Sequence, residues 1–272
     1  MIIEKATGLQ EIVEKWYRRL GFDKKYDDAF YACLAQTDLS DLTDFASYNS
    51  KENSPQKNLL ACLFFCEDLE QAYCKRGISQ QILLDSLQDV VIWNNSYYDV
   101  HGEIGLTEFP WLDRTFLMQI FRLGRLQFCV TPSWLDIAQL GIRKGDRIID
   151  VHIPRGASLR YEDCVASFEQ AKQFFATYYP DSPREWCICY SWLLDDTMLP
   201  LLGEHSNIAK FQTFFKPVHR DVSDAVIRFT FHWNTTRETV GDCVPISRFT
   251  KQLQAAAVNG QTFYEVLGIH KL

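Results

Sequence analysis

The chain has 272 residues, of which 47% are hydrophobic and 23% are charged, and its formal net charge is −7. This length suits two domains of roughly 100–150 residues each, and the composition is that of a folded protein rather than a disordered one. Lys and Arg form no basic run. A nucleic acid is therefore not expected as a partner, because nucleic-acid-binding proteins concentrate positive charge to neutralise phosphates.

The chain contains nine cysteines, an odd number, and several lie inside apolar stretches, which is not the pattern of a small disulfide scaffold. Residues 1–5 do not form the basic start of a signal peptide, since no long apolar run follows them. The longest apolar stretch, residues 59–66, is far shorter than the roughly 20 residues of a membrane helix. We expect a cytoplasmic protein that does not contact a membrane.

The first 120 residues predict a series of helices. Residues 9–20 place apolar side chains at the spacing of one buried helical face. Ser54 and Pro55 form a start signal for a second helix that should end at Gly77, and Ser79 opens a third. A further helix is predicted over residues 108–121. The sequence therefore predicts an all-helical N-terminal domain over residues 1–121.

From residue 122 the pattern changes to alternating strands and helices, which predicts an α/β (α+β) domain over residues 122–272. Strands are expected at residues 125–130, 147–153 and 186–193, near Val218, and at residues 225–233. Helices are expected at residues 206–215 and 247–258. A Ser-x-x-Gln capping box at Ser167 predicts that another helix begins there and ends near Pro180.

The central unit of this domain is the strand at 147–153, the helix from Ser167 and the strand at 186–193. The first strand carries Asp150 and His152 on one face. Such a unit should be parallel and right-handed, so that both strands end at the same edge of the sheet. Ligands of open α/β sheets bind at that edge, where Arg155 and Gly156 could hold a phosphate group. The alternative is that this loop is only a structural turn, and the sequence of the loop by itself favours this alternative.

The sequence resembles a bacterial acyltransferase-like family that combines a helical N-terminal domain with a GNAT-like N-acyltransferase domain, which implies a mixed sheet in residues 122–272. The resemblance covers nearly the whole chain. It rests on the segments Leu123-Gly124-Arg125-Leu126-Gln127-Phe128, Gly145-Asp146, Val151-His152-Ile153-Pro154-x-Gly156, Ser167-Phe168-x-x-Ala171, Ser191-Trp192-Leu193-Leu194-Asp195 and Ser206-Asn207-Ile208-x-x-Phe211-Gln212.

This resemblance implies an N-acyltransferase that moves an acyl group from acetyl-CoA or another acyl-CoA to a primary amine, in a small molecule or a peptide, without a metal. Acyl-CoA would lie beside the strand at 147–153, with its pyrophosphate at the N-terminus of the next helix. The expected coenzyme contacts are Ile153, Arg155, Gly156, Ser158, Ser167 and Asn207.

The chain departs from this family's pattern at two places. The compact Gln/Arg-x-x-Gly-x-Gly/Ala loop does not follow Ile153, and the helix from Ser206 lacks the Tyr that often protonates the leaving thiolate. A non-catalytic binding or regulatory protein with a degenerate GNAT-like fold therefore stays open as the alternative function.

His152, Tyr190 and Asp195 are the candidate catalytic residues. His152 is the candidate general base, Tyr190 could line the acyl groove, and Asp195 could orient the acceptor. Each has a plainer interpretation, as a hydrogen-bonded histidine, a core aromatic and a solvated turn, respectively.

The cysteines give no metal or nucleophile prediction. The pairs Cys62/Cys66 and Cys187/Cys189 lack further ligands at zinc spacing, and buried thiols are the favoured interpretation. Cys164 could have a lowered pKa near a helix start, but the sequence shows no base beside it.

Overall fold

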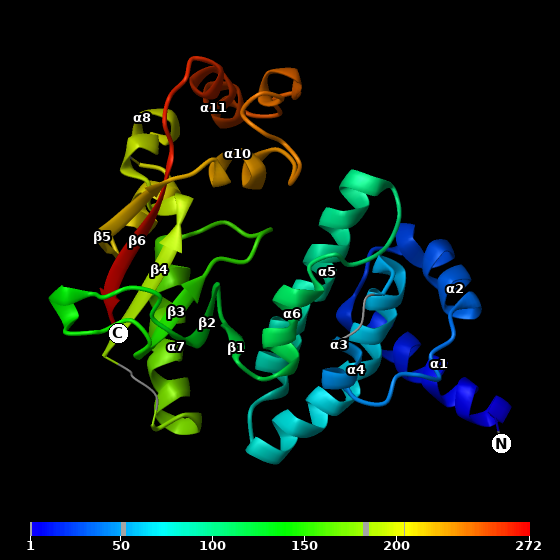
Figure 1. Cartoon of the computed structure of the whole chain (residues 1–272). Coiled ribbons are helices and arrows are strands. Elements are labelled where there is room, and N and C mark those ends of the chain that lie inside the picture. The colour runs from blue at the N-terminus through cyan, green and yellow to red at the C-terminus, as the bar shows by residue number, and fades with distance from the viewer. Residues whose placement is uncertain (1, 50–52, 182–184, 204) are drawn as a thin grey trace. The chain divides into compact units, whose positions relative to one another are not determined.

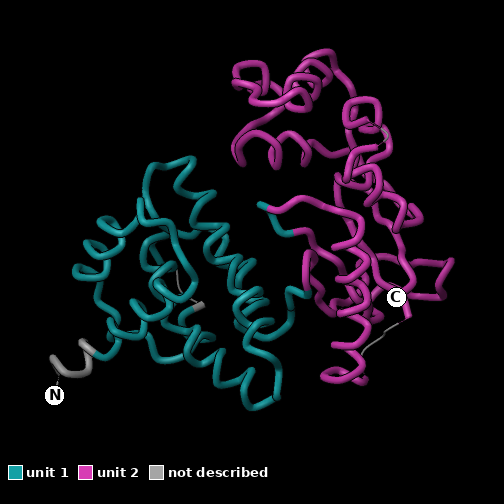
Figure 2. The backbone as a smooth tube through the Cα atoms, turned by 180° about the vertical axis from the view of Figure 1, so that it is seen from behind, with its two compact units in different colours: residues 1–123, 154–156 teal, residues 124–153, 157–272 magenta. Residues whose placement is uncertain are grey.

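The computed structural model describes residues 2–49, 53–181, 185–203 and 205–272. The chain forms two compact units: residues 1–123 with 154–156, and residues 124–153 with 157–272 (Figure 2). None of the helices in the described residues combines the length and hydrophobicity needed to span a bilayer.

The first unit is built from helices, as predicted (Figure 1). Its core contains large aromatic side chains, among them the stacked rings of Tyr17 and Phe30. The helices are α1 (Ile2–Leu20), α2 (Asp27–Gln36), α3 (Phe45–Asn49), α4 (Pro55–Arg76), α5 (Gln80–His101) and α6 (Phe109–Phe116), with a 3-10 turn, η1 (Lys24–Tyr26).

The helix signals of this unit act as the sequence predicts. The Ser54 side chain accepts a hydrogen bond from the Lys57 backbone N–H at the start of α4, and Gly77 ends that helix with a φ of 69°. Ser79 caps α5 in the same way. The predicted helix over residues 108–121 is wrong in its second half. Met118 adopts a left-handed φ of 54°, which ends the helical path, and Ile120–Leu123 form strand β1.

The described part of the chain has a sheet of six strands in the order β1-β2-β3-β4-β6-β5, and the last five belong to the second unit. Among the described residues of this unit, only β3 and β4 pair in parallel, and the helix α7 (Tyr161–Tyr178) connects them; the other strand pairs are antiparallel. These five strands are β2 (Leu126–Pro132), β3 (Arg147–His152), β4 (Trp186–Ser191), β5 (Lys216–Val222) and β6 (Tyr264–Lys271).

Helix α7 packs on one face of this sheet. Its Phe168 ring lies 6.0 Å from that of Phe128 on β2 and 4.2 Å from that of His270 on β6. The opposite face has its own cluster of buried side chains, formed by Ile137, Ile148, Ile188, Leu267 and Ile269. The mixed sheet predicted from the sequence is therefore confirmed.

The remaining helices of the second unit follow β4 and β5. They are α8 (Leu199–Leu202), α9 (Asn207–Gln212), α10 (Ala225–Thr230) and α11 (Arg248–Val258), with 3-10 turns η2 (Ala138–Leu140), η3 (Trp192–Leu194), η4 (Asp196–Met198) and η5 (Val240–Asp242). Ser206 caps α9, and Ser247 caps α11 through a capping box.

One sequence prediction in this part of the chain is wrong, and one strand was missed. Residues 225–233 were expected to form a strand, but Ala225–Thr230 form α10, and all of Ala225, Val226 and Ile227 are buried. A short apolar run fits either element, and packing against α11 decides for the helix. The sequence also did not predict β6, which pairs with both β4 and β5.

Candidate functional site

The parallel strands β3 and β4 are paired over a very short stretch. Within the described chain they pair only at Ile149 with Cys187 and at Asp150 with Ile188. Both strands continue beyond these pairs, since β3 pairs with β2 as far as His152 and β4 pairs with β6 as far as Ser191. The two carboxyl ends are therefore not hydrogen-bonded to each other, and backbone groups at this opening can bind an extended ligand as an added strand would.

The loop after β3 is held in place by side chains from two other elements of the same unit. Arg125 donates to the backbone oxygens of Ala157, at 2.7 Å, and Ser158, at 3.1 Å. Asn207, the first residue of α9, donates through Nδ2 to the Ser158 hydroxyl at 2.6 Å. The predicted coenzyme contacts Ser158 and Asn207 thus lie together, and both are exposed.

Helix α7 begins directly after this loop. Its N-cap residue, Arg160, makes no side-chain cap, so the first-turn N–H groups of this long helix can serve an external acceptor. The same turn carries Glu162 and Asp163, whose negative charges repel an anion. Asp163 forms an ion pair with Arg160 at 2.8 Å.

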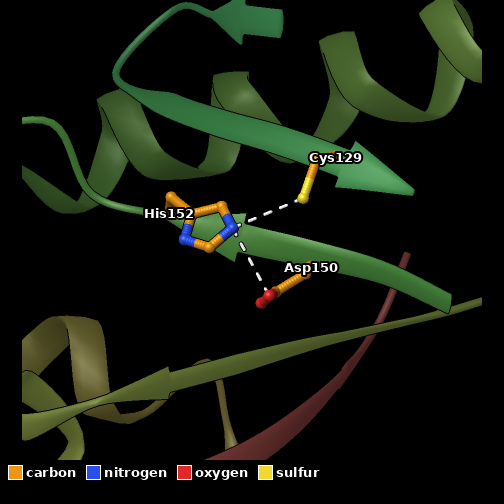
Figure 3. A group of neighbouring side chains, drawn as sticks. All are labelled: Cys129, Asp150 and His152. Carbon is orange, nitrogen blue, oxygen red and sulfur yellow. Dashed lines mark hydrogen bonds and ion pairs between the residues drawn. The ribbon is translucent and has the colours of Figure 1, made fainter. Parts of the chain in front are cut away.

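His152 lies at the end of β3, and two side chains contact its Nε2 atom (Figure 3). Nε2 is 3.3 Å from Asp150 Oδ2 and 3.4 Å from Cys129 Sγ. The side chains of His152 and Asp150 are 24% and 17% exposed, so solvent and a substrate can still reach the ring. The predicted shared face of Asp150 and His152 is present, and β2 adds Cys129 to it.

Tyr190 lies on β4, where its hydroxyl donates to Asp221 Oδ2 at 3.0 Å. Burial, the hydrogen bond to Asp221 and nearby carboxylates together raise the pKa of Tyr190. The exposed ring of Trp134 packs edge-on against Tyr190 at 5.4 Å. A phenol with a raised pKa is a weak proton donor, so this environment favours a role in binding over one in proton transfer.

Asp195 follows β4 but faces the interior of the second unit. It is fully buried; its Oδ1 accepts hydrogen bonds from the backbone N–H and hydroxyl of Thr197, and its Oδ2 accepts one from the Tyr264 N–H. The turn is therefore not solvated, and this carboxylate joins η3 and η4 to the start of β6.

Ser167 does not start a helix, and this corrects the capping-box prediction. It lies six residues inside α7, fully buried, where its hydroxyl donates to the Asp163 carbonyl and accepts from the backbone N–H groups of Arg125 and Leu126. The turn before β2 approaches it so closely that a Cβ at Gly124, where φ is 72°, would lie 2.9 Å from the Ser167 Oγ atom. Ser167 therefore joins helix to sheet, and its position does not suit it for a coenzyme contact.

Arg155 and Gly156 belong to the first unit, where Arg155 Nη1 donates to Ser96 Oγ at 3.2 Å. Gly156 is exposed and has a φ of 102°, a conformation that favours glycine. Ile153 is half-buried directly after β3. The coenzyme contacts predicted for these three residues stay predictions.

The buried thiols support the plain interpretation of the cysteine pairs. Burial raises the pKa of Cys62, Cys66, Cys187 and Cys189. Burial also raises the pKa of Cys164 to about 11, which corrects the lowered value considered from the sequence. These thiols stay protonated near neutral pH and are poor nucleophiles.

The second unit has a cavity of about 370 Å³. None of the predicted site residues lines it; its walls are Leu194, Asp196, Leu199, Ala209, Gln212, Thr213, Phe215 and Pro217.

The sequence did not single out two residues that shape the site, Cys129 and Arg125. Both lie on or beside β2, whose register places Cys129 opposite Asp150. The alternation along residues 125–130 and 147–153 could have suggested a shared face, but only the antiparallel register shows which residues meet.

Two family models match the chain: a GNAT-like C-terminal domain at residues 120–270 and an N-acyltransferase N-terminal domain at residues 4–118. No curated protein matches it.

Solved structures give a fold-level likeness. One is an acyltransferase in complex with decanoyl-CoA and teicoplanin, with a TM-score of 0.69 and 20% identity over 79% of this chain and 65% of that chain. Another is an acyltransferase in complex with decanoyl-CoA, with a TM-score of 0.69 and 21% identity over 79% of this chain and 66% of that chain. The chain thus spans slightly less than two thirds of the length of these structures. Because the GNAT-like model alone matches more than half of its 272 residues, the chain belongs to the family of proteins with a GNAT-like C-terminal domain.

Proposed function

We propose that this protein is an acyl-CoA-dependent N-acyltransferase that transfers an acyl group to a primary amine by direct attack. The observation that carries the proposal is the opening between the carboxyl ends of β3 and β4, with His152 at its edge. The family match and the likeness to acyltransferases in complex with acyl-CoA support this choice of donor.

The donor would bind with its pantetheine arm in the opening. That arm is extended and carries amide groups, which can form strand-like hydrogen bonds with the backbone edges of β3 and β4. The pyrophosphate would lie at the uncapped N-terminus of α7, near the Ser158 hydroxyl and the Asn207 amide.

His152 would act as the general base. With its Nε2–H donating to Asp150, the ring accepts a proton through Nδ1, and the Asp150 carboxylate stabilises the imidazolium that forms. The ammonium group of the acceptor loses a proton to His152, and the free amine attacks the thioester carbonyl. The new C–N bond forms and the C–S bond breaks, and the coenzyme A thiolate becomes a thiol by taking up the second proton, which leaves the attacking nitrogen.

A non-catalytic binding or regulatory protein is the second candidate. Glu162 and Asp163 in the first turn of α7 favour it, because their charges repel a pyrophosphate, and so does the missing compact glycine loop.

Thermal melting with coenzyme A, acetyl-CoA and decanoyl-CoA tests donor binding. A ligand at about 100 times its Kd stabilises by about 2.7 kcal/mol, which raises the melting temperature by about 5–10 °C for a chain of this size. No shift with any of the three at millimolar concentration would contradict the acyltransferase proposal. The predicted pyrophosphate contact of Arg155 is tested in the same assay: Arg155→Ala should reduce the shift, and Arg143→Ala, at an exposed turn, should not.

Turnover separates the two candidate functions. The assay follows release of the coenzyme A thiol with acetyl-CoA, octanoyl-CoA or decanoyl-CoA and a panel of primary amines, including teicoplanin. His152→Ala should retain the melting shift and lose about 10²–10⁴ in rate, the usual contribution of a general base. A His152→Ala variant with full rate would remove that residue from the mechanism. Donor binding without turnover of any amine would favour the non-catalytic candidate.

A further inference from the structure

We infer that Cys129, Asp150 and His152 form a binding site for one transition-metal ion of the zinc type. The three side chains come from two neighbouring strands. Cys129 on β2 lies directly opposite Asp150 on β3, and His152 follows Asp150 by two residues. They therefore leave the same face of the sheet and point toward one another (Figure 3). The Sγ atom, a carboxylate oxygen and a ring nitrogen all lie within 4.8 Å of one another.

Two of the three distances between the ligand atoms match the edges of a tetrahedral site. Zinc bonds of about 2.3 Å to sulfur and about 2.0–2.2 Å to nitrogen and oxygen place sulfur about 3.6 Å from nitrogen and nitrogen about 3.4 Å from oxygen. The corresponding distances are 3.4 Å between Cys129 Sγ and His152 Nε2, and 3.3 Å between His152 Nε2 and Asp150 Oδ2. The third distance, between Cys129 Sγ and an Asp150 oxygen, is at most 4.8 Å. A tetrahedral site needs about 3.6 Å for this edge, so these two side chains must approach each other by no more than about 1.2 Å to admit the ion.

The contacts also converge on one atom. A neutral ring nitrogen carries either one proton or one lone pair, so Nε2 cannot fully serve both a thiol and a carboxylate at once. An ion bonded to all three atoms removes this conflict. Binding releases the thiol proton to the buffer, and the neutral imidazole carries its proton on Nδ1.

The ligand set indicates the class of ion. A thiolate and an imidazole favour Zn²⁺ or Co²⁺ over Mg²⁺ or Ca²⁺, which prefer oxygen ligands. The thiolate and carboxylate together balance the two charges of the ion. Cys129 is 2% exposed, whereas the His152 side chain is 24% exposed. The ion would therefore have three protein ligands on its buried side and a fourth coordination position open to water. One consequence rests on the proposed function: with the ion on Nε2, the ring carries its proton on Nδ1, the atom that would accept the proton of the amine, and the ion therefore inhibits the proposed acyl transfer.

Cobalt titration of the full chain tests the site without any acyl donor, so its result does not depend on the proposed function. We expect one Co²⁺ per chain and the near-ultraviolet absorption of a cobalt–thiolate bond, both displaced by Zn²⁺. Cys129→Ser should abolish the absorption. Asp150→Asn and His152→Ala should weaken binding by more than about tenfold, the smallest effect of altering even an indirect metal contact. Cys243→Ser, at a half-buried thiol of the same unit, is the matched control and should bind normally.

Circular dichroism of each variant establishes that it is folded. Absence of the absorption in the wild-type chain at millimolar Co²⁺ would overturn the inference. So would an absorption that persists in folded Cys129→Ser or disappears in Cys243→Ser. Once turnover is established, Zn²⁺ should inhibit the wild-type chain and leave Cys129→Ser at its own metal-free rate; equal inhibition of both would contradict the inhibitory role.

Discussion

The ends of the two parallel strands, β3 and β4, use their polar side chains in opposite ways. At the end of β3, His152 is partly exposed and its Nε2 atom contacts two other side chains. After β4, Asp195 is fully buried and holds two backbone N–H groups and a hydroxyl of its own chain. A polar residue at the carboxyl edge of a sheet is thus a candidate for ligand binding only where it is accessible and is not buried in hydrogen bonds to the backbone of its own chain.

Replacing Asp195 should give the largest loss of stability. Asp195→Ala leaves the donors of Thr197 and Tyr264 without their charged acceptor, and hydrogen bonds to charged groups contribute about 1.5–3 kcal/mol each. Because three bonds to one carboxylate do not contribute additively, we expect urea denaturation to show a loss of about 3–5 kcal/mol, less than the sum of three separate bonds.

The neighbouring Asp196 is the matched control. It is exposed and paired with Arg220 at the surface, so Asp196→Ala should cost less than about 1 kcal/mol. If the two substitutions were equally mild, Asp195 would not join η3 and η4 to β6 in the way that its hydrogen bonds indicate. Its predicted role toward the acceptor would then become the better interpretation.

Replacing Ser167 should give an intermediate effect. Ser167→Ala leaves the buried N–H groups of Arg125 and Leu126 without an acceptor, which costs about 1–3 kcal/mol. Donor-induced melting shifts should stay unchanged, because the side chain is inside α7. Ser158→Ala should do the reverse: it should barely change stability, since Ser158 is exposed, and it should weaken the donor shift. If instead Ser167→Ala weakened the donor shift and Ser158→Ala lowered the stability, Ser167 would again be a candidate coenzyme contact.

Replacing His152 should change stability only slightly. Because the ring is partly exposed and its Nε2 atom contacts side chains rather than backbone groups, we expect His152→Ala to change the free energy of unfolding by less than about 1 kcal/mol. Urea denaturation of the wild type and the variant measures this. A loss of stability as large as that of Asp195→Ala would mean that both residues have a structural role. The difference between the two strand ends would then not hold.

The smallest expected effect is the pH dependence of stability due to His270. Burial among phenylalanines lowers its pKa, while its hydrogen bond to the Phe214 carbonyl raises it by less. The unfolded state therefore binds the proton more readily, and stability falls as the pH decreases below about 6.5. Denaturation at about pH 7.5 and about pH 5.5 should show a smaller loss for His270→Gln than for the wild type. The exposed His232→Asn should behave like the wild type; an unchanged pH dependence in His270→Gln would contradict this role.

The sequence by itself determined the elements whose signals are local. The serine caps located the starts of α4 and α5, Gly77 located the end of α4, and strand patterns located β2, β3 and β4. The shared face of Asp150 and His152 also follows from the period of a strand. These features depend on residues within a few positions of one another, so their physical cause can be read along the chain.

Only the tertiary structure decided how distant segments use their side chains. Ser167 matches a capping box, but Arg125 and Leu126 occupy its hydroxyl; Asp195 looks like a solvated turn, but the start of β6 buries it. The register of β2 on β3 likewise brings Cys129 to His152. Each outcome is fixed by hydrogen bonds and packing between segments far apart in the sequence, and a local pattern does not show which distant residue a side chain will contact.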